Sequence, residues 1–247
     1  MSSLFIPAVF CSGCLVSYAI YRLFTTVRYL FLVITLVAIL YLSFSINISL
    51  LHLGKALVFF LGAVFFDALR LQLIRLNNFF RCFLYVVLSV NILYMNLVYF
   101  SFDLIFFLSS ILLVITLPAA RMLFIQDTQY HGLGWKGMSW TWSLFYTIWN
   151  LLLCYVVSNI FILHAVILTV AFLCTIKAPE FYFEIRVYTL ATLFLMIPII
   201  YSHPAFVAAI HIPVLPAIIS ALEVILVIWA LIHMYCFVNA HLKQKLE

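Results

Sequence analysis

The stretch "SALEVILVIWALIHMYCFVNAHL", Ser220–Leu242, is apolar along almost its whole length. The range 212–240 contains no Asp, Lys or Arg, and Glu223 is its only fully charged residue. Runs of about 18 or more residues with so few charges are typical of helices that cross a membrane. Because a carboxylate near the centre of such a helix costs roughly 2.5–3.5 kcal/mol to insert, Glu223 is a candidate functional residue.

The composition extends this interpretation to the whole chain. Of its 247 residues, 68% are apolar or aromatic and 8% are charged, whereas soluble domains carry about 25% charged residues. A water-soluble protein could not cover its surface with so few charges, and the long uninterrupted apolar runs argue against a barrel of alternating strands. We therefore expect an all-α polytopic membrane protein with about five to seven membrane helices, built as a single transmembrane domain over 1–247.

The twelve Lys and Arg residues are scattered singly along the chain. Isolated cations of this kind are typical of helix ends at a membrane surface, where they contact lipid headgroups, so cardiolipin is a candidate partner. They form no patch suited to a nucleic acid, and none is expected as a partner. Their distribution leaves the orientation in the membrane open.

Apolar runs separated by charged or glycine-rich connections predict the individual helices. Cys82–Tyr99 and Ile105–Leu117 are expected to form a pair of spanning helices. A polar loop with three glycines is expected over 118–142. An Arg-bearing helix is predicted over 160–202, and a Glu-bearing helix over 205–243.

The segment "DALRLQLIRLNNFFR", 67–81, mixes charges into an apolar pattern. Asp67, Arg70 and Arg75 alternate there with leucines and an isoleucine. Two interpretations stay open, a helix that lies along the membrane interface and a helix end packed inside the protein.

Arg186 follows Glu180 and Glu184 and is itself followed by sixteen residues without a full charge before His203. One interpretation is that Arg186 extends to the membrane interface while the two glutamates mark a helix end. The other is an intramembrane guanidinium that acts on ions, because an arginine stays protonated in proteins and attracts a carboxylate without relaying a proton.

Three histidines are, with Glu223, candidates for a proton path. His203 and His211 lie in a proline-rich bend, where the alternative is a solvated or capping imidazole. His233 follows Glu223 by ten residues, which places it about 15 Å away along one helix face. The sequence holds one CxxC, Cys11–Cys14, in an apolar segment with no second pair, where simple packing is expected. It holds no histidine spacing suited to a metal, nucleophile motif or phosphate-binding loop, so neither a metal nor a cofactor is expected, and no covalent chemistry is assigned to this chain.

At these residues the chain resembles subunit a of rotary F-type ATP synthases. In that family the first of two long, tilted helices carries an essential Arg after a proline, and the second carries a Leu-Glu pair and then a "QAYVF"-like stretch. Here "PEFYFEIRVYTLATLFL" offers Arg186 with Pro179 seven residues before it, and the last helix offers Leu222-Glu223 and "HMYCF". The resemblance covers about the last 80 residues.

The resemblance implies a proton-translocating stator subunit in the membrane sector of an ATP synthase. Its last two helices would lie tilted against a rotating c-ring, and Arg186 would face the ring carboxyls. Glu223, His203, His211 and His233 would line one proton half-channel, with Glu180 and Glu184 on the other. Its partners would be the c-ring and other membrane subunits of the synthase, in the mitochondrial inner membrane or, as the alternative, a bacterial plasma membrane.

Two other functions are compatible with the composition. A structural or accessory membrane subunit of another respiratory complex would use its isolated charges to bind partner helices or lipid. A small secondary transporter would show paired halves or helices broken at the midplane, and the sequence contains no internal repeat. Arg186 and Glu223 on adjacent helices, in one seam, would favour the stator over the accessory subunit.

Overall fold

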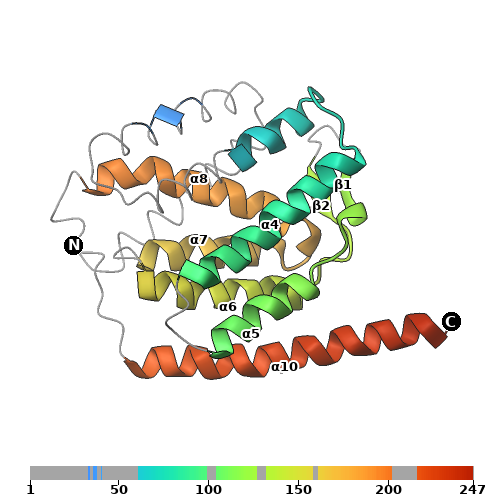
Figure 1. The fold of residues 1–247 in the computed structure, drawn as a ribbon. Helices are drawn as coiled ribbons and strands as arrows, with labels where there is room; N and C mark the ends of the chain where they lie inside the picture. Colours follow the sequence, from blue (N-terminus) through green and yellow to red (C-terminus); the bar gives the residue numbers. More distant parts are fainter. Residues whose placement is uncertain are drawn as a thin grey trace.

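A computed structural model of the chain describes residues 61–98, 104–126, 132–157, 161–201 and 216–246, with four further helical residues at 33, 36, 37 and 40. The described residues are mostly helical (Figure 1). Within the described ranges, two helices are long and apolar enough to cross a membrane, with apolar spans at Asn78–Met95 and Ser220–Ala240.

Residues 61–70 are helical, and the labelled elements follow them along the chain. The α-helices are α4 (Asn78–Val98), α5 (Leu104–Ile115), α6 (Trp140–Val157), α7 (Phe161–Thr175), α8 (Tyr182–Tyr201) and α10 (Pro216–Leu246). The short elements between them are η1 (Ala120–Met122), β1 (Leu123–Ile125), β2 (Leu133–Trp135) and η2 (Pro179–Phe181).

Side-chain caps and prolines fix where several helices begin. The Asn77 Oδ1 accepts a hydrogen bond from the Phe80 N–H at 3.0 Å, and α4 starts there. The Ser139 Oγ accepts one from the Trp142 N–H at 3.1 Å and starts α6. Pro216 opens α10, in the first helical position where the missing N–H costs nothing.

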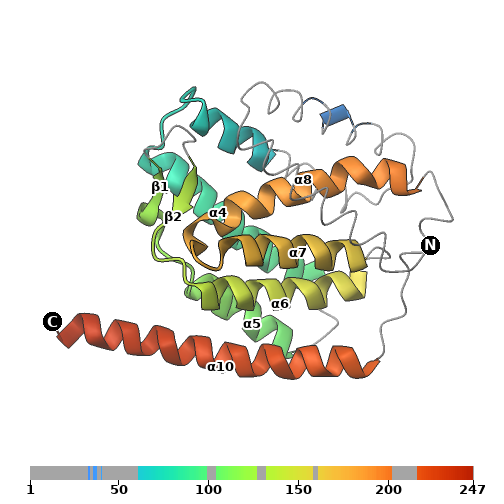
Figure 2. The ribbon, with the colours of Figure 1, turned by 180° about the vertical axis from the view of Figure 1, so that it is seen from behind.

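Four helices form a layer in the order α8, α7, α6, α10. α7 packs against both α8 and α6, and α6 packs against α10. Figures 1 and 2 show α8 and α10 at opposite edges of this layer, with α6 and α7 between them. The Trp229 indole N–H donates to the Thr141 carbonyl at 3.0 Å and fixes α10 on the start of α6.

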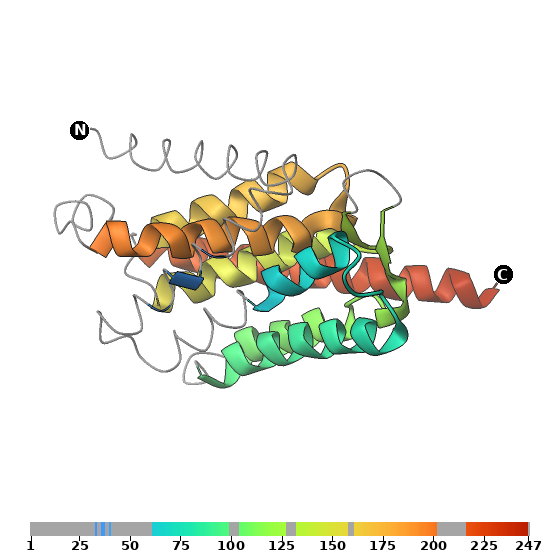
Figure 3. The ribbon, with the colours of Figure 1, turned by 90° about the horizontal axis from the view of Figure 1, so that it is seen from above.

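A second group of helices covers one side of this layer. α5 packs against α4, α6 and α10, and the α5–α6 contact is held by two indole hydrogen bonds, from Trp142 to the Leu113 carbonyl and from Trp149 to Ser110 Oγ, each 3.1 Å long. Residues 61–70 lie between α4 and α8 (Figure 3). The aromatic residues of α6 thereby occupy the centre of the molecule.

The chain between α5 and α6 forms a small antiparallel hairpin. β1 and β2 pair with Phe124 opposite Gly134, and a Cβ added at Gly134 would collide with the Phe124 ring. The sequence predicted this range, 118–142, as a polar loop. The structure instead gives it 3₁₀ and strand structure and buries Leu133 and Trp135, while residues 127–131 lie outside the described part.

Several described helices expose large apolar side chains on the outside of the molecule. Only 11% of each membrane-length span is buried. Between Val224 and Val238 the exposed residues of α10 are almost all apolar. The exposed apolar residues of α4, α5 and α10 include Phe79, Phe83, Val86, Val90, Leu104, Leu108, Ile115, Ile228, Leu231 and Tyr235.

The predicted helices agree in part with the observed ones. The expected pair Cys82–Tyr99 and Ile105–Leu117 corresponds to α4 and α5. The single Arg-bearing helix expected over 160–202 is instead two helices, α7 and α8, separated by a turn and η2. The break falls where Lys177 and Pro179 interrupt the apolar pattern, because a proline disfavours helical conformation in the residue before it.

Candidate functional site

Two faces of α8 carry the polar residues of the site. Glu184 and Tyr188 are four residues apart and share one face, which is directed toward residues 61–70. Tyr182 and Arg186 are also four residues apart and share another face, directed toward α6. The first turns of α8 therefore present different groups to two neighbouring helices.

The first face holds a buried ion cluster. The Arg70 Nη1 donates to Glu184 Oε1 at 2.7 Å and to the Tyr188 hydroxyl at 3.2 Å. The Tyr188 hydroxyl in turn donates to Asp67 Oδ1 at 3.3 Å. The Arg70 side chain is 0% exposed and that of Glu184 4% exposed, so the cluster is removed from solvent and joins residues 61–70 to α8.

The second face of α8 holds a buried arginine, Arg186, for which no ion pair is found among the described residues. Tyr182 and Thr147 share a hydrogen bond of 2.8 Å between their hydroxyls, which connects α8 to α6. Arg186, one turn further along, is 5% exposed. Its Nε and Nη1 are buried and have no hydrogen-bond partner among the described residues. Nε carries one N–H and Nη1 two, so three donors of this guanidinium have no acceptor there.

Arg186 lies at a cavity of about 100 Å³. Residues 61–70, α4, the hairpin, α6, η2 and α8 all contribute to its wall. The wall is mainly apolar and aromatic, and its members include Phe66, Leu84, Leu88, Trp135, Phe183 and Val187.

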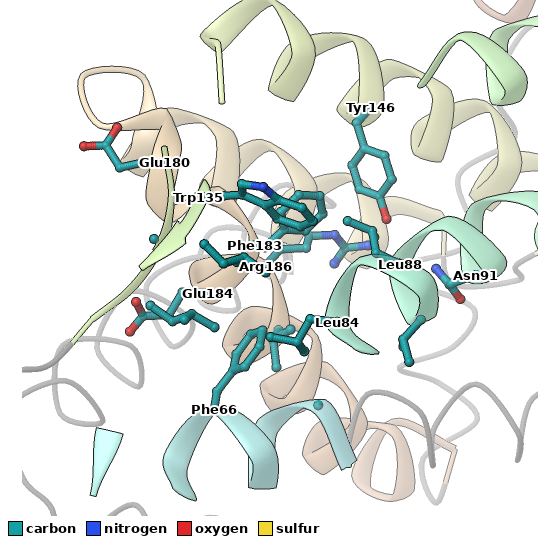
Figure 4. A pocket seen from close by; sticks show the side chains of 16 residues that line it. Phe66, Leu84, Leu88, Asn91, Trp135, Tyr146, Glu180, Phe183, Glu184 and Arg186 are labelled. Carbon is teal, nitrogen blue, oxygen red and sulfur yellow. The ribbon is translucent and has the colours of Figure 1, made fainter. Parts of the chain in front are cut away.

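The polar groups at the cavity are divided between its two sides. Figure 4 shows the Arg186 guanidinium on the same side as the Tyr146 hydroxyl and the Asn91 amide. The carboxylates of Glu180 and Glu184 lie on the other side and point away from the guanidinium. One end of the cavity is therefore positive and rich in hydrogen-bond donors, and the acidic groups are at the opposite end.

The structure brings together three of the residues that the sequence singled out. Arg186 and Glu184 are buried on α8, and the half-buried Glu180 lies on η2 at the edge of the same cavity. The interpretation of Arg186 as a residue that extends to the interface does not fit its burial. His203 and His211 lie outside the described residues.

Neither of the two candidates on α10 is among the residues that line this cavity. Glu223 is exposed and lies three residues from the start of the apolar span Ser220–Ala240, not at its centre. His233 is buried between α10 and α6, with its ring 5.9 Å from that of Phe145. Both ring nitrogens of His233 are buried without a hydrogen-bond partner among the described residues.

The expected seam between the Arg-bearing and Glu-bearing helices is wrong for the described part of the chain. α10 packs on α6 and α5, and both α6 and α7 lie between it and α8 (Figure 1). The physical reason is that the aromatic side of α6, with Phe145 and the Trp229–Thr141 hydrogen bond, provides the surface on which α10 is buried. Arg186 and Glu223 therefore belong to different parts of the molecule.

Sequence reasoning missed the partners of α8. Asp67 and Arg70 had been noticed as charges three residues apart in an apolar segment, with the membrane interface as one interpretation. The structure supports the other interpretation, a helix end packed inside the protein, since Asp67 is 1% and Arg70 3% exposed. Tyr146, Tyr188 and Asn91 gave no signal, because a tyrosine or asparagine in an apolar helix has no distinctive spacing.

Comparisons with known proteins found no match to this chain among protein-family models, curated proteins or solved structures. In the described part of the chain, no group of three or more His, Cys, Asp or Glu side chains is placed to hold a metal ion. The described side chains of the site are a guanidinium whose Nε and Nη1 lack acceptors among the described residues and a mainly apolar cavity wall.

Proposed function

We propose that this chain is an integral membrane protein that binds a small organic anion at Arg186. The membrane location is supported by the two membrane-length helices and by the large apolar side chains exposed on α4, α5 and α10. A charged fraction of 8% agrees with it, because such a surface suits lipid and not water.

The observation that carries the anion-binding proposal is that Arg186 lies at the cavity with its buried Nε and Nη1 unpaired among the described residues. An ion removed from water loses several kcal/mol of solvation, and a partner of opposite charge must restore it. An arginine cannot escape this cost by losing its proton. At an effective dielectric of about 20, an anion 4 Å away would contribute roughly 4 kcal/mol of attraction. An anionic ligand in the cavity would therefore supply the missing partner.

The proposal is tested by thermal unfolding of the purified protein in detergent, followed by the fluorescence of its five tryptophans. Sodium salts of organic anions are compared with sodium chloride at equal ionic strength, so that general salt effects cancel. We expect at least one organic anion to raise the melting temperature of the wild-type protein in a saturable way, because a ligand that binds only the folded state stabilises it.

The matched variants are Arg186→Met and Arg75→Met. Both remove one guanidinium, but Arg75 is exposed and does not line the cavity. The anion-induced shift should disappear in Arg186→Met and persist in Arg75→Met. An equal shift in all three proteins would mean that the anions act elsewhere, and the proposal would be withdrawn.

The proton-translocating stator of an F-type ATP synthase is the second candidate. The same observation supports it, since a stator needs a permanent positive charge that attracts carboxylates inside the membrane. The burial of Arg186 within the monomer and the separation of α8 from α10 favour the first candidate. In the stator, a rotor carboxyl would have to reach a guanidinium enclosed by residues 61–70, α4 and α6.

Co-purification distinguishes the second candidate from the first. A stator would be isolated from the mitochondrial inner membrane, or a bacterial plasma membrane, with a c-ring and a soluble catalytic head, and Arg186→Ala would abolish proton-driven ATP synthesis. Isolation with a different respiratory complex would identify an accessory subunit. Isolation as a separate protein agrees with the anion-binding proposal, with transport as one use of that site.

A further inference from the structure

We propose that the anion bound at Arg186 is a short-chain monocarboxylate, with its carboxylate at the guanidinium and its apolar tail between the aromatic walls of the cavity. This inference rests on the proposed anion-binding function and names its ligand class. Three features of the site support this ligand class. They are the hydrogen-bond donors at one end of the cavity, its apolar wall, and the position of the two glutamates.

The donor end fits a carboxylate group. The buried Nε and Nη1 of Arg186 lack acceptors among the described residues, and the planar guanidinium matches the two oxygens of a carboxylate better than a point charge does. The Tyr146 hydroxyl and the Asn91 amide lie on the same side of the cavity (Figure 4). A carboxylate seated here would find neutral donors beside the charged one.

The remaining wall fits a short hydrocarbon tail. The rest of the cavity wall includes Phe66, Leu84, Trp135 and Phe183. Apolar groups of a ligand are removed from water by such a wall, whereas a second polar group would lose its hydration without a partner. A volume of about 100 Å³ is smaller than the cavity of about 150 Å³ that accommodates a benzene. A tail of a few carbons is therefore favoured over a long acyl chain.

The acidic end argues against ligands with two negative charges. Glu184 is held in place by its 2.7 Å ion pair with Arg70, and Glu180 lies on the same side. A dicarboxylate that reached across the cavity would bring its second charge toward Glu180, while the charge of Glu184 is already compensated by Arg70. Like charges close together select against a ligand. Phosphate would also leave most of the apolar wall unused.

The closing experiment uses the purified full-length protein in detergent with butyrate as the probe. Butanol and butylamine test the need for the negative charge at constant tail length. Succinate and inorganic phosphate test the need for a single charge, and laurate tests whether the carboxylate comes from a long-chain lipid. Binding is measured by calorimetry and by the shift of the melting temperature.

We expect saturable binding of butyrate, no binding of butanol or butylamine, and an affinity for succinate and phosphate weaker by about tenfold or more. Leu84→Trp should abolish butyrate binding, because the larger side chain fills the cavity while Arg186 is retained. Leu73→Trp is its matched control, since Leu73 is 70% exposed. If Arg186→Met fails to fold, Arg186→Lys keeps the charge without the planar fork and should bind butyrate more weakly.

The outcomes separate this inference from the proposed function. Succinate, phosphate or laurate binding more tightly than butyrate, and losing affinity in Arg186→Met, would overturn the ligand class and leave the anion site standing. Absence of any anion binding that depends on Arg186 would overturn both.

Discussion

Arg70 and Arg186 are both buried against α8, but their surroundings differ. Arg70 has an ion pair with Glu184 and a hydrogen bond to Tyr188, which also contacts Asp67. Arg186, two residues after Glu184, has buried nitrogens without a hydrogen-bond partner in the described part of the chain, and it lies at a cavity. The same side chain is thus a structural element in one place and an available binding group in the other.

This difference teaches how burial of a charge is to be interpreted. A buried charge with a partner holds two helices together, and removing it leaves the partner unpaired. A buried charge without a partner weakens the fold, so its presence indicates a function that needs it. The following mutations test whether Arg70 stabilises the fold and whether Arg186 instead serves as a binding group.

The largest expected effect is on Arg70. Arg70→Met leaves Glu184 and Asp67 as buried carboxylates without their cation, which should lower the free energy of unfolding by about 3–5 kcal/mol. Thermal or denaturant unfolding in detergent measures this loss. Arg75→Met, an exposed arginine of the same segment, should change stability by less than about 0.5 kcal/mol. Equal effects of the two variants would contradict the structural role of the Arg70 cluster.

A smaller loss is expected when the cluster keeps its charges and loses one hydroxyl. Tyr188→Phe removes the group that accepts from Arg70 at 3.2 Å and donates to Asp67 at 3.3 Å. Hydrogen bonds to charged groups contribute about 1.5–3 kcal/mol, so the free energy of unfolding should fall by about that amount. A Tyr188→Phe protein as stable as the wild type would show that the Arg70–Glu184 pair needs no support from this hydroxyl.

A gain in stability is expected at His233. Its two ring nitrogens are buried between α10 and α6 without hydrogen-bond partners among the described residues. His233→Leu removes these polar atoms, and the free energy of unfolding should rise by about 1 kcal/mol. Anion binding at Arg186 should not change. A marked loss of stability would mean that the imidazole has a partner that the present packing does not include.

The smallest effect is expected at Glu223, which is exposed near one end of the apolar span of α10. Glu223→Gln should change stability by less than about 0.5 kcal/mol and leave anion-induced stabilisation intact. The stator function makes the opposite prediction, since Glu223 would then relay protons. Loss of proton-driven ATP synthesis in this variant would favour the stator over an anion-binding protein.

The sequence predicted where the helices lie along the chain better than it predicted which helices pack against one another. α4, α5 and the charge-poor α10 follow from apolar runs long enough to be recognised by composition alone. The break between α7 and α8 was missed, although Pro179 marks it, because apolar runs lie on both sides of the short charged segment 177–186. Which helices lie side by side depends on side-chain packing, such as that of Trp229 on α6, which no local pattern reports.

The sequence predicted which charged residues belong to the candidate site, but it did not predict which of them form ion pairs. Arg186, Glu180 and Glu184 were recognised because charges are rare in this chain. The partner of Glu184 lies 114 residues away in the sequence, and no periodicity connects positions so distant. The choice of Arg70 as that partner, which leaves Arg186 at the cavity, is a property of the tertiary structure alone.

The most direct measurement is the free energy of unfolding of Arg186→Met relative to the wild type, in the absence of organic anions. If the guanidinium is buried without a partner, replacing it with an apolar side chain should leave the protein as stable or make it more stable, by about 1–4 kcal/mol. A loss as large as that of Arg70→Met would contradict this account, because it would show that Arg186 already has the partner that we assign to a ligand.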